Sequence, residues 1–173
     1  MKTLTLALLT FVVSIPVAAQ DSSEDNGALV PDYTSNIETD NMSLMVIHLN
    51  DVTTDALFSP PSKYALRAQA RTNTMFFVQG VAKGDLRVST DYELAQVDQL
   101  TRQGPTLRTT AVNISNFETG TELSDGEQFQ GIITTPSQAL NLSAPFEVKL
   151  DPTGGNYTIG FRFSQEAVER LER

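Results

Sequence analysis

His48 is the only histidine among the 173 residues, and the chain contains no cysteine. A serine-type hydrolase needs a base beside its nucleophile, and a zinc site needs several histidine or cysteine ligands. His48 lies inside the apolar run 44–49, where a hydrogen-bonded structural histidine is more common than a catalytic one. The sequence therefore favours neither a nucleophilic hydrolase nor a zinc protein, and we assign no catalytic, cofactor-binding or metal-binding residue.

Carboxylates are the second group of side chains that could do chemistry. A glycoside hydrolase uses two of them, about 5–10 Å apart, as its acid and its base or nucleophile. Six acidic residues gather around two predicted loops: Asp51, Asp55, Glu118, Glu122, Asp125 and Glu127. Carboxylates on loops usually face water, where no burial raises their pKa toward neutrality. A carboxylate-dependent glycan hydrolase is therefore kept as the second alternative only.

The charge and the glycine pattern argue against nucleic acids and nucleotides. The formal net charge is −9, and an acidic surface repels phosphates. The pair Gly154-Gly155 lies in a predicted hairpin turn, without the strand–loop–helix context of a phosphate-binding loop. The acidic residues of segment 21–43 also lack the spacing of a calcium loop. We expect no nucleic-acid partner.

Phe76 and Phe77 form the candidate interaction surface. They lie in the run Met75-Phe76-Phe77-Val78, and consecutive residues of a strand point to opposite faces of its sheet. One of the two rings must then cover something beyond the first core layer. A second sheet, the terminal helix, a partner or a ligand would each satisfy this requirement.

Alternating apolar residues indicate the elements that position these side chains. They predict strands at 44–49, 64–70, 75–81, 86–95, 112–117 and 129–133. The clearest signal is a hairpin in which strands 146–150 and 157–163 flank the turn-rich segment 151–156. After about Ala95 we expect a helical turn, and Ser164 is placed to cap a short helix at 165–172.

These elements predict an all-β domain: an antiparallel β-sandwich of seven to eight strands with a short C-terminal helix, or alternatively a small β-barrel. We expect three segments along the chain. Residues 1–19 read as a secretory signal peptide, with Lys2, an apolar run and small residues before Gln20. Residues 20–43 carry six acidic and no basic residues and read as a disordered linker, and residues 44–173 form one β-domain.

A signal peptide indicates a periplasmic or secreted protein, and the lack of cysteine favours a bacterial envelope. No second long apolar run follows residue 19, so we expect no membrane span after cleavage. The first functional hypothesis is a non-enzymatic domain that binds or assembles with another macromolecule, such as an envelope protein. The first alternative is a carrier that holds a small apolar ligand inside a barrel. The sequence does not set the oligomeric state.

Overall fold

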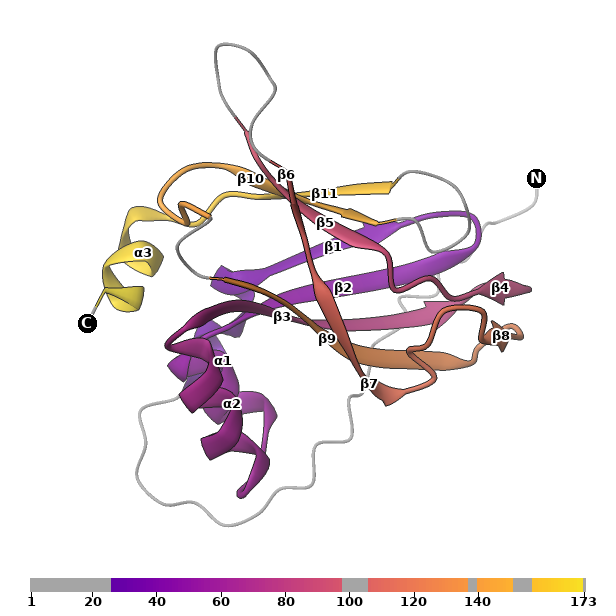
Figure 1. Ribbon diagram of the computed structural model, residues 1–173, viewed down its shortest axis with the longest axis horizontal. Helices are drawn as coiled ribbons and strands as arrows, with labels where there is room; N and C mark the ends of the chain where they lie inside the picture. The colour runs from indigo at the N-terminus through magenta and orange to yellow at the C-terminus, as the bar shows by residue number, and fades with distance from the viewer. Residues whose placement is uncertain (1–25, 98–105, 137–139, 151–156, 173) are drawn as a thin grey trace, which may run out of the picture.

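The computed structural model describes residues 26–97, 106–136, 140–150 and 157–172. Four predicted features lie wholly or partly outside these ranges. They are the signal peptide, residues 20–25 of the linker, residues 98–103 of the segment where a helical turn is expected, and the hairpin turn 151–156. The described part contains eleven strands and four helical segments (Figure 1).

Two antiparallel sheets face each other and form a sandwich, as predicted. The larger sheet has the order β1-β2-β3-β9-β7, with strands Thr34–Glu38, Met42–Leu49, Asn73–Ala82, Gln128–Pro136 and Thr110–Ser115. The smaller sheet has the order β11-β10-β5-β6, with strands Tyr157–Phe161, Phe146–Leu150, Tyr92–Gln96 and Thr106–Arg108. A two-stranded ribbon joins β4 (Leu86–Arg87) to β8 (Glu122–Leu123). The sheets do not close into a barrel, so the barrel alternative is wrong.

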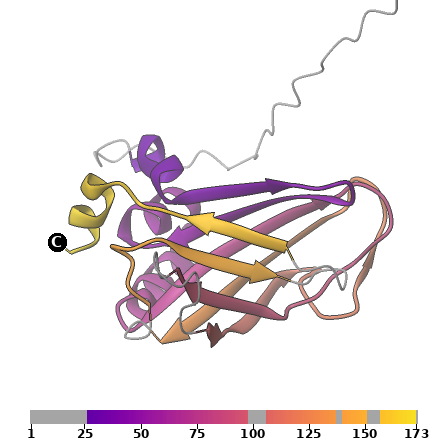
Figure 2. The same cartoon turned by 90° about the horizontal axis from the view of Figure 1, so that it is seen from above.

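The helical segments gather at one end of the strands, on the left in Figures 1 and 2. They are η1 (Asn26–Tyr33), α1 (Asp51–Leu57), α2 (Ser62–Ala70) and α3 (Gln165–Leu171). Tight turns connect the strands at the opposite end, where Gly84 and Gly126 adopt φ values of 140° and 82° that favour glycine. None of the helices in the described part has both the length and the apolar character that a bilayer span requires.

Rings from both sheets fill the space between them. Phe146 and Phe161 stack with their centroids 5.0 Å apart, as neighbours in the β10–β11 register. Phe76 of the larger sheet packs against both, at 5.8 and 5.5 Å. This packing confirms the predicted register of the hairpin and leaves its large side chains inside. A carrier with an open barrel interior does not fit a core filled in this way.

The predicted linker is wrong for residues 26–43. This segment forms η1, β1 and the start of β2, so the domain begins before residue 44. Tyr33 is fully buried, and its hydroxyl donates a hydrogen bond to the carbonyl of Ala167, 3.1 Å away. Polar residues are compatible with β1 because it is an edge strand with one face toward solvent, and its backbone pairs with β2 whatever its side chains are. The polar composition of residues 26–43 therefore led to the wrong prediction of a disordered linker, because an edge strand can also be polar.

The predicted strand at 64–70 is also wrong, because this segment lies in helix α2. Its apolar residues fit both periods: Leu66 and Ala70 are four positions apart and pack together under the helix. Ala, Leu, Arg and Gln are strong helix formers, and here that propensity decides. The expected loop around Asp51 and Asp55 is likewise helix α1. By contrast, Ser164 caps α3 as predicted and accepts a hydrogen bond from the Ala167 amide.

Candidate functional site

The predicted interaction residues Phe76 and Phe77 lie on opposite faces of β3, and both are covered by the chain itself. Phe76 points between the sheets and is 0% exposed, whereas Phe77 points to the outer face and is 8% exposed. The ring of Phe58, which follows α1, meets Phe77 edge-on at 5.6 Å. Phe77 therefore covers a second, smaller core beneath α1 and α2, and the pair is not a free surface. The sequence placed the rings correctly but could not show that helices cover one of them.

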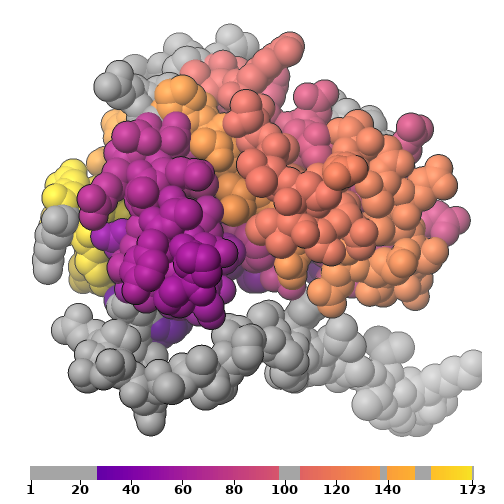
Figure 3. All heavy atoms as spheres, turned by 60° about the horizontal axis from the view of Figure 1, so that its bottom comes forward, coloured from indigo at the N-terminus to yellow at the C-terminus, as the bar shows by residue number. Residues whose placement is uncertain are grey.

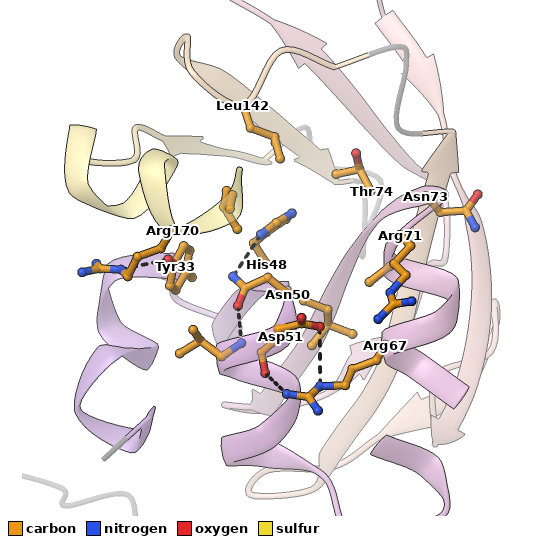
Figure 4. A pocket seen from close by; sticks show the side chains of 14 residues that line it. Tyr33, His48, Asn50, Asp51, Arg67, Arg71, Asn73, Thr74, Leu142 and Arg170 are labelled. Atoms are coloured by element: carbon orange, nitrogen blue, oxygen red, sulfur yellow. Dashed lines mark hydrogen bonds and ion pairs between the residues drawn. The ribbon is translucent and has the colours of Figure 1, made fainter. Parts of the chain in front are cut away.

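A pocket of about 380 Å³ opens at the helical end of the sandwich, and we call it the His48 pocket (Figure 4). It lies where β2 runs into α1, and parts of α2, β3 and α3 complete its wall. Its polar lining includes Tyr33, His48, Asn50, Asp51, Arg67 and Arg71. Arg170 also lines it. No single sequence motif marks this site, because its walls come from segments that are up to about 140 residues apart in the chain.

His48 is 4% exposed and packs among rings, with centroid distances of 5.3 Å to Phe76 and 5.4 Å to Phe163. Burial disfavours the charged imidazolium and lowers the pKa of His48 to about 4. The residue is therefore neutral at pH 7, as a structural histidine would be. Its ring nevertheless borders the pocket, so it does not belong to the core alone.

Asn50 fixes the orientation of His48 through the cap of α1. Its side-chain oxygen accepts hydrogen bonds from the amides of Val52 and Thr53, at 2.9 and 3.1 Å. The oxygen is thereby committed to the helix, and the amide nitrogen faces Nδ1 of His48 at 3.4 Å. An amide nitrogen only donates, so Nδ1 is the acceptor and the proton of the neutral ring lies on Nε2. Asn50, which caps α1, thus also selects the tautomer of His48.

Ion pairs hold two of the arginines in place. Arg67 pairs with Asp55 and lies 3.5 Å from Asp51, while Lys63 also reaches Asp55 at 2.6 Å. Arg170 pairs with Asp32, and its Nε donates to the hydroxyl of Tyr33 at 3.3 Å. That hydrogen bond is the main reason why the pKa of Arg170 is raised. The contacts of Arg67 tie α2 to α1, and the contacts of Arg170 tie η1 to α3.

The second candidate surface is the edge formed by β6 and β7. These two strands follow one another in the chain, and Thr109 alone separates them. β6 is an edge of the smaller sheet and β7 an edge of the larger, so one segment borders both sheets on this side. On the opposite side, β1 lies beside β11, and Ser35 donates a hydrogen bond to the carbonyl of Gly160 at 3.0 Å. The sandwich is therefore tied together along one side, and on the other side no described strand pairs with the outer edge of β7.

The apolar row across the outer face runs out at this edge. In register, Ile47 lies beside Phe77, Phe77 beside Ile132, and Ile132 beside Val112 of β7. The first three are buried, whereas Val112 is 56% exposed, and Ile114 nearby is 47% exposed. In Figure 3 the helices and the β7–β9 region form neighbouring parts of one face. This exposed end of the apolar row is therefore a candidate surface for contact with another molecule.

The acidic residues of the hydrolase alternative have structural contacts. Asp55 lies in the ion pairs described above, and Glu118 accepts a hydrogen bond from the Asn113 side chain at 2.7 Å. Glu127 accepts one from the backbone amide of Ser124 at 2.6 Å, within a turn. These partners favour a structural role for the three carboxylates. Across the described ranges, no three His, Asp or Glu side chains come together in a way that could hold a metal ion.

Neither site carries a signature that ties it to a known group of proteins. The geometry has a buried histidine, a cluster of arginines and a free strand, and each of these occurs in unrelated folds. In sequence, the chain matches no protein-family model and no curated protein.

Proposed function

We propose that the protein is an exported, non-enzymatic binding domain that assembles with another protein by accepting an extended segment at the β6–β7 edge. The carrying observation is the apolar row that ends at Val112 in solvent. An added strand would pair with the outward backbone groups of β7 and place its own apolar side chain beside Val112. Strand addition thus supplies both the missing hydrogen bonds and the missing cover.

The composition of the edge supports the same proposal. Natural sheets protect their edges with proline, lysine, strong bulges or very short strands. Segment 106–115 contains neither proline nor lysine, and Arg108 is its only charged residue. The pairing of β7 with β9 has one irregularity, a register shift between Asn113 and Ser115 near the end of β7. β6 has only three residues, whereas all six residues of β7 are exposed, so β7 is the open part of this edge.

Export is the part of the proposal that rests on the sequence alone. Residues 1–19 have the order of charge, apolar run and small residues that signal peptidase recognises. An exported partner is therefore expected, in the periplasm or outside the cell.

A cysteine scan can test the interface, since the natural chain has no cysteine. Val112→Cys would carry a cysteine-reactive photo-crosslinker in cells that export the protein. We expect one dominant protein adduct, identified by mass spectrometry, and a recovered chain that begins at Gln20. Tyr64→Cys is the matched control, because Tyr64 is another large exposed hydrophobic residue, 62% exposed, but lies on α2.

The outcomes separate clearly. An adduct that forms from residue 112 and not from residue 64 supports strand addition at the edge. Equal adducts from both positions, or none from residue 112, would contradict the proposal. A dominant adduct whose partner peptide comes from the same chain would identify the occupant as a second copy.

A further inference from the structure

The His48 pocket concentrates positive charge in an acidic protein. The described ranges contain nine Lys and Arg residues, and three of them, Arg67, Arg71 and Arg170, line this one pocket. The chain as a whole has a formal net charge of −9. Asp51 is the one acidic residue among the described lining residues, so arginines outnumber carboxylates there, and such a cleft attracts ligands of negative charge.

Of the three arginines that line the pocket, Arg71 is the one without an ion pair to a described residue. Arg67 is answered by Asp51 and Asp55, and Arg170 by Asp32. In the part of the chain that the structure describes, the guanidinium of Arg71 has no ion-pair partner. It follows α2 directly and lies four positions after Arg67, so both side chains rise from one face of the same segment.

The buried wall of the pocket offers hydrogen-bond donors. His48 carries its proton on Nε2, because Nδ1 faces the amide nitrogen of Asn50. The ring is more than nine-tenths buried and lines the pocket. Among the described residues, no acceptor receives a hydrogen bond from its Nε2. In Figure 4 the ring of His48 stands in the middle of the wall, between Tyr33 and Thr74. The Nε2–H group of His48 and the guanidinium of Arg71 are both hydrogen-bond donors, so they favour a ligand rich in acceptor atoms.

We propose that the His48 pocket binds a small oxyanion ligand, with its carboxylate or phosphate group at Arg71 and an oxygen within reach of the Nε2 proton of His48. The volume of about 380 Å³ suits a small organic anion and lies in the usual range of ligand pockets. The role of Arg71 is charge neutralisation through forked hydrogen bonds, which guanidinium groups make readily with both kinds of oxyanion. This site is separate from the β6–β7 edge and does not depend on strand addition there.

The single histidine makes the test specific. The imidazole signals of the purified protein would be followed by nuclear magnetic resonance while succinate, inorganic phosphate or the uncharged succinamide is added at low ionic strength. We expect a saturable shift of the His48 signals with at least one of the two anions and none with succinamide. The anion that binds more tightly distinguishes a carboxylate ligand from a phosphate ligand.

Variants identify the residue responsible. Arg71→Gln should weaken binding by about tenfold, since it removes a charge-assisted contact. Arg71→Lys keeps the charge but not the forked geometry, so it should lose less affinity than Arg71→Gln. Arg162→Gln is the matched control, because Arg162 is exposed and does not line the pocket. No saturable shift with either anion, equal binding of succinamide, or equal losses in the 71 and 162 glutamine variants would each overturn the proposal.

Discussion

Lowering the pH should destabilise the folded protein through one residue, His48. Its pKa is about 4 in the folded chain and 6.5 in an ordinary environment, because the ring is buried among Tyr33, Phe76 and Phe163. Between these two values, the unfolded chain binds a proton that the folded chain does not bind. The contribution of neutral His48 to stability is therefore complete above pH 6.5 and is lost as the pH falls toward 4.

The size of the effect follows from the difference between the two pKa values. Integrating proton binding from pH 7 to pH 5 gives a loss of about 2 kcal/mol in the free energy of unfolding. The slope in the middle of this range is about 1 kcal/mol per pH unit. Such a loss is a large fraction of the stability of an ordinary domain.

Urea unfolding at a series of pH values would measure this slope. The variant His48→Phe keeps an aromatic ring in the cluster and removes the titrating group. All other titrating groups are common to both chains, so the difference between their two slopes isolates His48. Parallel curves for the natural chain and the variant would refute the reasoning. A titration of the His48 signals centred near 6.5 in the folded protein would refute it as well.

Two further pairs of substitutions test the packing of the two cores. Gly131→Ala places a Cβ 1.8 Å from the buried ring of Phe117, so urea unfolding should show a loss of about 3 kcal/mol in the free energy of unfolding. The control Gly160→Ala meets no atom within 4 Å and should change this free energy by less than about 1 kcal/mol. Phe77→Ala should lower the free energy of unfolding by about 3 kcal/mol or more, because it empties the outer core beneath the helices. Tyr64→Ala, at an exposed position, should lower it by less than about 1 kcal/mol. Equal losses in these two variants would refute the existence of the outer core.

The predictions that held were those in which a side-chain pattern has only one physical solution. The hairpin of β10 and β11 is an example, because a slip of one residue would turn Phe146 and Phe161 into solvent. The cap of α3 is another, since Ser164 precedes a short amphipathic segment and satisfies a free amide. Strands β2, β3 and β9 were also recognisable from their dense apolar residues.

The predictions that failed were those in which local composition permits two structures. Segment 64–70 fits a strand period and a helix period, and the contact of Leu66 with the outer core selects the helix. Segment 34–38 is polar enough for a linker, yet pairing with β2 places it in the sheet. In the first case the deciding contacts come from strands elsewhere in the chain, and in the second from the next strand, so composition within the segment decides neither.

The sequence by itself determined a mostly β domain, a terminal helix, the placement of Phe76 and Phe77 on opposite faces of one strand, and a buried His48, since hydrophobic periodicity is a local property. Only the tertiary structure decided that α1 and α2 cover Phe77, that Val112 ends the outer apolar row in solvent, and that Arg71 shares a pocket with His48. Cover, edges and pockets are relations between distant segments, and no local pattern records them. Both candidate sites depend on such relations.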